Sequence, residues 1–78
     1  MTPEQCRAAR ALLAWSQTML ADQAHLGMST VRDFEKGRRM PSYNNLLAMK
    51  LALQEAGVIF LDEEDDGPGP GVRLRRGF

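Results

Sequence analysis

Apolar residues recur at the three- and four-residue intervals of an α-helix in four consecutive segments of the first 57 residues. The first segment begins with Thr2, a good N-cap, and with Pro3, which suits the first helical position. Gln5 stands where its side chain can reach back and complete a capping box. We expect this helix to end near Trp15. Its expected inward positions are Cys6, Ala9, Leu12 and Leu13.

The next two segments predict short helices joined by a tight turn. Ser16 is the expected N-cap of the earlier helix, whose apolar face comprises Leu20, Ala21 and Ala24. Because Ala21 is small, a second helix can cross this one closely, as a helix-turn-helix requires. The later helix spans residues 28–36, with Val31 and Phe34 inward, and Gly37 ends it where helices commonly turn left-handed.

The fourth segment begins at Ser42, a further N-cap, and stops at Gly57. Its expected apolar face comprises Leu46, Leu47, Met49, Ala52 and Leu53. These four helices predict a mainly α fold, with a four-helix domain over residues 1–57.

Beyond Gly57 the pattern changes to that of strands. Residues 58–61 are β-branched, aromatic or aliphatic, and residues 72–75 alternate apolar with charged side chains. The link over residues 62–70 is acidic and then rich in Gly and Pro, so the strands can pair within one chain or across two. We favour pairing across two chains, because an isolated two-stranded ribbon is marginal in water. Residues 58–78 are therefore a strand-loop-strand extension for dimerisation, with the contact residues Val58, Ile59, Phe60, Leu61, Val72 and Leu74.

The net charge is zero, but it is unevenly distributed. Residues 1–61 hold seven Lys/Arg and five Asp/Glu, whereas residues 62–78 hold three and five. Four cations lie between positions 32 and 39. Phosphate binding depends on such local patches more than on the total charge.

Composition argues against several functions. The 78 residues make one small domain without an apolar run long enough to cross a membrane, and the start of the chain lacks the features of a signal peptide, so we expect a cytoplasmic protein. Cys6 is the only cysteine and His25 the only histidine, which leaves no catalytic set and no metal site. The acidic run Asp62 to Asp66 lacks the spaced ligands of a calcium loop. We expect no enzyme activity and no cofactor.

The stretch from Arg10 to Leu53 resembles the helix-turn-helix domain of the phage-repressor and Cro-like family, often called the Xre type. The matching residues, in order, are Trp15-Ser16-Gln17, Leu20-Ala21, Ala24, Ser29-Thr30-Val31, Phe34-Glu35-Lys36-Gly37-Arg38-Arg39, Pro41, Leu46 and Leu53. This resemblance implies a lambda-repressor-like fold that binds double-stranded DNA. It also implies that Gln17 touches a phosphate while bracing the recognition helix, and that Arg10 pairs with Glu35.

The recognition helix over residues 28–36 presents a face opposite Val31 and Phe34. The expected base-reading residues on that face are Met28, Ser29, Arg32 and Asp33. Arg32 is the foremost of these, because a guanidinium can donate to both O6 and N7 of guanine. The expected phosphate-binding residues are Gln17, Lys36, Arg38, Arg39, Asn44 and Asn45.

Two positions depart from the family pattern. His25 stands in the turn where Gly is usual, and Gly27 stands where Ser or Thr often caps the recognition helix. His tolerates a left-handed backbone better than most residues, and Gly is an acceptable N-cap. A left-handed Gly27 would instead shift the start of the recognition helix by about one residue.

The sequence thus favours a homodimeric transcriptional regulator, in particular a repressor of an inverted-repeat operator. One alternative is an antitoxin whose tail over residues 58–78 binds a toxin. Another is a protein-interaction module that no longer reads DNA and docks partners through the strand at residues 58–61.

Overall fold

The structure is a computed structural model that describes residues 1–61 and 69–75. The acidic run Asp62 to Asp66 lies outside these residues. The elements are α1 (Pro3–Leu13), α2 (Gln17–Ala24), α3 (Met28–Glu35), α4 (Tyr43–Glu55), β1 (Val58–Leu61) and β2 (Gly71–Leu74). The predicted mainly α fold with two terminal strands is confirmed.

Side-chain caps define where the helices begin. Thr2 and Gln5 form the predicted capping box at the start of α1. Ser16 and Ser42 each accept a hydrogen bond from a backbone N–H in the first turn of α2 and α4. The end of α1 is unusual, because its C-cap, Ala14, is left-handed with φ 56°, a conformation that glycine usually occupies at the end of a helix.

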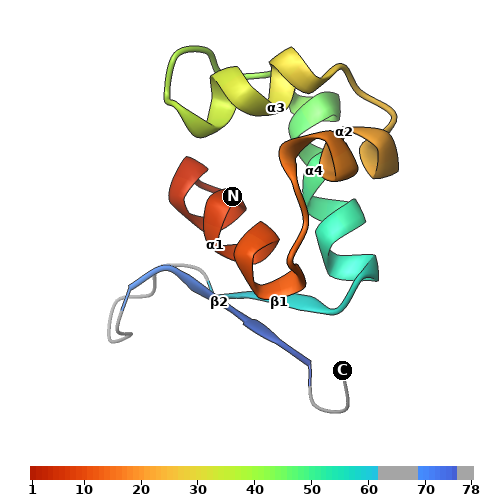
Figure 1. Ribbon diagram of the computed structural model, residues 1–78. Coiled ribbons are helices and arrows are strands. Elements are labelled where there is room, and N and C mark those ends of the chain that lie inside the picture. Colours follow the sequence, from red (N-terminus) through yellow and green to blue (C-terminus); the bar gives the residue numbers. More distant parts are fainter. Residues whose placement is uncertain (62–68, 76–78) are drawn as a thin grey trace.

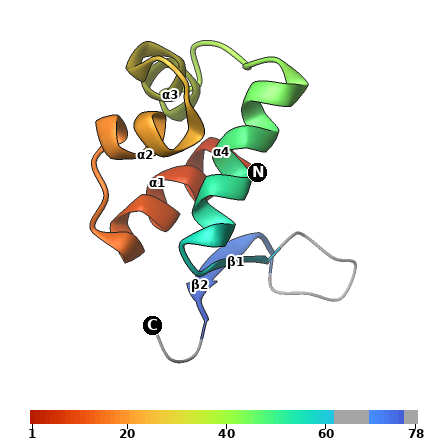
Figure 2. The same cartoon turned by 90° about the vertical axis from the view of Figure 1, so that its right-hand side faces the viewer.

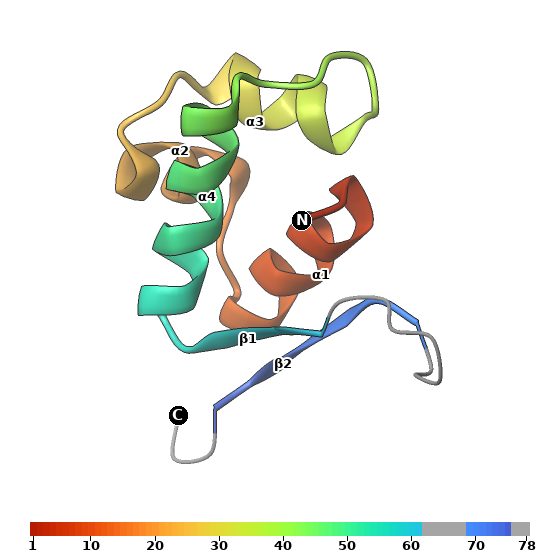
Figure 3. The ribbon, with the colours of Figure 1, turned by 180° about the vertical axis from the view of Figure 1, so that it is seen from behind.

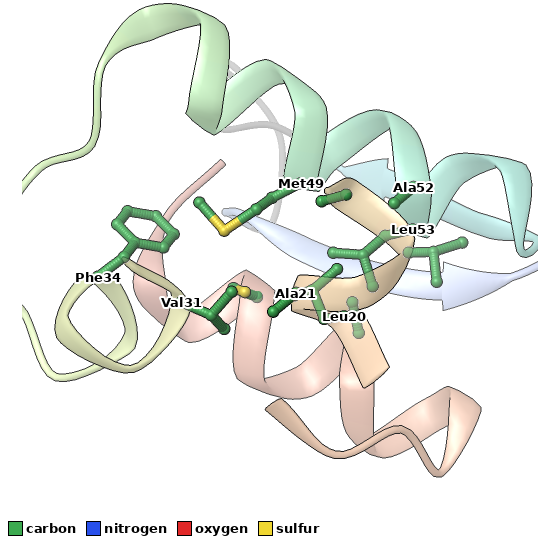
Figure 4. Packing of buried hydrophobic residues seen from close by; sticks show 11 residues of the cluster. Leu20, Ala21, Val31, Phe34, Met49, Ala52 and Leu53 are labelled. Carbon is green, nitrogen blue, oxygen red and sulfur yellow. The ribbon is translucent and has the colours of Figure 1, made fainter. Parts of the chain in front are cut away.

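The core lies where the four helices meet (Figure 4). Leu20 and Ala21 of α2, Val31 and Phe34 of α3, and Met49, Ala52 and Leu53 of α4 are buried around Cys6 and Ala9 of α1. These expected core positions are confirmed.

Two leucines expected in the core lie on the surface instead. Leu12 is 43% exposed and Leu47 is 38% exposed. The buried row of α4 runs through Leu46, Met49 and Leu53, which leaves Leu47 with Tyr43 and Leu51 in an outward row at four-residue spacing. In α1, the inward row of Cys6, Ala9 and Leu13 leaves Leu12 at the edge of the buried face.

The two strands pair with each other within one chain, antiparallel, with Val58 opposite Leu74 and Leu61 opposite Gly71. The favoured pairing across two chains is therefore not what the structure shows. The physical reason is that α1 and α4 cover one face of the sheet, so the ribbon is not isolated (Figures 1 and 2).

Gln5 connects α1 to the end of this sheet. Its side-chain amide is buried and donates to the carbonyl oxygens of Leu61 and Gly71, both at 3.1 Å. Its Oε1 accepts from the N–H of Thr2 at 2.9 Å. One residue therefore caps a helix and holds both strands.

The sheet and α3 lie at opposite ends of the molecule, with α1 and α4 between them (Figures 1 and 3). Within residues 1–61 and 69–75, no helix is both long enough and apolar enough to cross a membrane.

Candidate nucleic-acid interface

The turn between α2 and α3 determines at which residue α3 begins. His25 is the C-cap of α2 and is left-handed, with φ 59°. Gly27 is extended, with φ −71°, and serves as the N-cap of α3. The helix therefore begins at Met28, and the shifted register that a left-handed Gly27 would impose is not adopted.

The outward side of α3 carries the four residues expected to read bases. Met28 is 43% exposed, Ser29 is exposed, and Arg32 and Asp33 are half-buried. The Nε of Arg32 lies 3.5 Å from Oδ1 of Asp33, so the carboxylate can orient the guanidinium. Because solvent reaches both side chains, the contribution of the pair to stability is small.

A basic loop follows α3. Gly37 is left-handed, with φ 73°, as the sequence predicts for the residue that ends this helix. The N–H groups of Arg38 and Arg39 both donate to the carbonyl oxygen of Asp33. The side chains of Lys36, Arg38 and Arg39 are exposed, so the loop displays three cations beside the outward face of α3.

A hollow of about 230 Å³ lies between α3, this loop and the start of α4. Its lining residues are Ser29, Thr30, Asp33, Arg39, Met40, Pro41, Ser42 and Asn45. Asn45 faces the hollow, whereas Asn44 is exposed outside it. The sequence did not predict Met40 at this surface, because only the folded loop brings it beside Ser29 and Asp33.

Glu35, at the end of α3, is a buried carboxylate that is only 2% exposed. Arg10 binds it through two hydrogen bonds of 2.7 Å, from Nε to Oε2 and from Nη2 to Oε1. The side chains of Gln17 and Cys6 donate to the same carboxylate at 3.0 and 3.1 Å. Arg10 also donates to the carbonyl oxygen of Trp15, in the link between α1 and α2. Because Gln17 belongs to α2, the cluster joins α1, α2 and α3.

The electrostatics of this cluster are consistent with a charged pair. Burial alone would raise the pKa of Glu35, but hydrogen bonds from Arg10, Gln17 and Cys6, with the charge of Arg10, outweigh it and hold that pKa below its usual value. The hydrogen bond to Glu35 raises the pKa of Arg10. Burial, aided by the neighbouring carboxylate, raises the pKa of Cys6, which therefore stays a protonated donor.

The structure thus brings Arg10, Gln17 and Glu35 together, as the family resemblance implies. Sequence reasoning missed Cys6 as a donor to Glu35 and missed Arg7, whose Nη1 donates to the backbone carbonyl of Glu35. The only available signal was that Arg7 stands three residues before Arg10, on the same side of a helix.

The residues expected at a dimer contact fall into two groups. Val58 is 3% exposed, and Phe60, Val72 and Leu74 pack against the protein's own core. Only Ile59 and Leu61 alternate to the other face of the sheet, where Leu61 is 37% exposed. Four of the six side chains thus pack in or against this chain's own core, and the contact with a partner stays a prediction.

Comparison with known families agrees with this geometry. A family model described as helix-turn-helix matches residues 7–55, which is more than half of the chain and includes α1 to α4 almost entirely. No curated protein sequence matches the chain. The chain therefore belongs to the Cro-like, Xre-type helix-turn-helix family, a family of DNA-binding regulators.

Proposed function

We propose that this protein is a sequence-specific transcriptional repressor that places α3 in the major groove of an inverted-repeat operator. The observation that carries the proposal is the outward face of α3, where Arg32 stands beside Asp33 and is followed directly by an exposed basic loop. A face that combines hydrogen-bonding side chains with flanking cations has the chemistry of base reading and phosphate binding together.

In this proposal, Arg32 reads guanine through O6 and N7, and Asp33 orients Arg32 or accepts from cytosine. Ser29 donates to or accepts from a base edge, and Met28 contacts a thymine methyl group. Lys36, Arg38, Arg39 and Asn44 hold phosphates. Asn45, which lines the hollow together with Ser29 and Asp33, holds a phosphate as well in this proposal.

Gln17 has two roles in this proposal. It braces α3 through its 3.0 Å hydrogen bond to Glu35 and touches a phosphate at the start of α2. The Arg10–Glu35 pair neutralises a carboxylate that would otherwise repel the DNA backbone and fixes α3 on α1. Repression follows from occupation of promoter DNA.

The proposed assembly is a homodimer that forms through the outer face of the sheet, around Ile59 and Leu61. Because the sheet and α3 lie at opposite ends of the molecule, this contact leaves both recognition helices free (Figure 1). Reading half-sites about one helical turn, roughly 34 Å, apart requires the two protomers to meet at an angle that turns both recognition helices to one side of the dimer.

Selection from a random duplex library, with wild type and Arg32→Ala side by side, tests the proposal. We expect a palindromic motif for wild type and loss of its guanine-containing positions for the variant, at a cost of about 1–3 kcal/mol per lost base contact. The same motif with both proteins would contradict the role of Arg32. Failure of wild type to bind any duplex at low salt would favour the interaction-module alternative.

Arg38→Ala is the matched control, because it removes the same charge from the loop and not from the helix. It should weaken binding to all sequences alike. It should also reduce the slope of log affinity against log salt by about one.

A further inference from the structure

Two arginines of α1 hold residue 35, each through a different group. Arg10 binds the carboxylate of Glu35, whereas Nη1 of Arg7 donates to its backbone carbonyl oxygen. Arg7 and Arg10 are three residues apart and therefore lie on the same side of α1, toward α3. Glu35, the last residue of α3, is thus held through both its side chain and its main chain.

The contact of Arg7 completes the hydrogen bonding at the end of α3. The last four carbonyl groups of a helix lack partners within the helix itself. Here Arg32 O accepts from Lys36 N, Asp33 O from Arg38 N and Arg39 N, and Phe34 O from Gly37 N. The carbonyl of Glu35 is the fourth, and Arg7 supplies its donor. A guanidinium at this end also complements the negative pole of the helix dipole.

We propose that Arg7 is a positioning residue for DNA reading, and this inference rests on the proposed function. It holds the last turn of α3 at the point where the chain leaves the helix for the basic loop. Arg32 belongs to that turn, since its carbonyl accepts from Lys36. A fixed last turn keeps the guanidinium of Arg32 and the cations of the loop in one arrangement.

Loss of Arg7 should reduce discrimination more than affinity for DNA in general. A loosened last turn can still present its charges to phosphates, because phosphate contacts tolerate displacement. A bidentate contact to guanine needs a defined geometry. We therefore expect the ratio of specific to non-specific affinity to fall about tenfold for Arg7→Gln, within the discrimination that one such contact supplies.

The test uses the full chain and fluorescence anisotropy with two labelled duplexes of equal length, the selected site and a scrambled site, over a range of salt. Arg7→Gln is compared with Lys50→Gln, which also removes one positive charge, from a side chain of α4 whose Nζ lies 5.5 Å from the centre of the Phe60 ring, at the sheet end of the molecule. Arg7→Lys retains a cation that can reach the carbonyl and should recover most of the ratio. The control Lys50→Gln should leave the ratio unchanged.

Two binding results would overturn the inference. Equal weakening on both duplexes, with the salt slope reduced by about one, would make Arg7 a phosphate contact. Unchanged affinities for both duplexes would show that Arg7 has no role in reading DNA.

Amide hydrogen exchange without DNA separates this inference from the proposed function. Arg7→Gln should speed exchange at Gly37 and Arg38 while the strands keep their protection. Unchanged exchange there would refute the positioning role even if wild type reads DNA. Faster exchange in Arg7→Gln, together with a wild type that does not discriminate the two duplexes, would instead refute the proposed function alone.

Discussion

Breaking the Arg10–Glu35 pair should cost this protein a large part of its stability. Glu35 is 2% exposed, and the side chain of Arg10 is 18% exposed. Arg10→Met keeps the length and the apolar stem of the side chain but leaves an ionised carboxylate in the core. Only the donors of Gln17 and Cys6 would then remain on that carboxylate.

The magnitude follows from this geometry. Removing one partner of a buried ion pair costs about 3–5 kcal/mol, and the partial exposure of Arg10 places the loss at the lower end, about 3 kcal/mol. A domain of this size has a total free energy of unfolding of roughly 4–12 kcal/mol. The double variant Arg10→Met with Glu35→Leu removes both charges, so it should lose less than the sum of the two single losses.

Urea unfolding followed by circular dichroism at neutral pH measures all four corners of this cycle. We expect the three variants to retain the helical spectrum and the two single losses to be non-additive by about 1 kcal/mol or more. A loss below about 1 kcal/mol for Arg10→Met would refute the argument. So would strict additivity.

The same pair predicts a dependence on pH. The pKa of Glu35 is lower in the folded protein than in the unfolded chain, so its ionised form stabilises the fold fully above roughly pH 4.3. This stabilisation is lost as the pH falls through the folded-state pKa. The difference in unfolding free energy between wild type and Glu35→Gln should therefore shrink in acid, and a difference that grew in acid would contradict the assignment.

Three further changes test the fold and the assembly. Ala14→Gly should raise the free energy of unfolding by about 1 kcal/mol, because Ala14 has a left-handed backbone that glycine adopts without strain. The control Ala11→Gly, inside α1, should lower the free energy of unfolding by about as much, because glycine disfavours a helix interior. A lower free energy of unfolding in both variants would refute the reasoning. Gln5→Glu keeps the capping box but removes the donors to Leu61 and Gly71, so it should cost about 1–3 kcal/mol and speed amide exchange in the strands; unchanged protection would contradict this. Leu61→Lys should shift the proposed dimer to monomer by light scattering without changing the helical spectrum, and a persistent dimer would exclude the outer sheet face as the contact.

Most of the fold could be predicted from the sequence because its signals are local. Thr2, Ser16 and Ser42 cap helices through their own neighbours, and the apolar periodicity that follows each cap defines a buried face. The left-handed Ala14 has no such signal. It is imposed by the chain reversal that lets the N–H of Trp15 donate to the carbonyl of Arg10.

The remaining features depend on contacts between distant parts of the chain. Leu12 and Leu47 follow the periodicity of core residues, but within residues 1–61 and 69–75 no element packs over them, so both stay exposed. The paired strands are held at one end by Gln5, which lies more than fifty residues away in the chain. Gln5 was identified only as a helix cap because its long-range partners are backbone carbonyls, which leave no trace in residue type.

The candidate site divides in the same way. The outward positions of α3 follow from the helical period once Val31 and Phe34 are placed inward. The support behind them does not, because Cys6 looks like an ordinary buried apolar residue and Arg7 like a solvated cation. Both act on Glu35 from α1. The resemblance implies that Arg10 of this helix reaches Glu35, but it gives no such role to Cys6 or Arg7.

An NMR titration of the ¹⁵N-labelled chain with its selected duplex tests the central claim, that α3 is the surface that reads DNA. We predict that the largest amide shifts fall on residues 28–33 and on the loop through Asn45, with the strands almost unchanged. Shifts concentrated on β1 and β2, with α3 unaffected, would contradict the account.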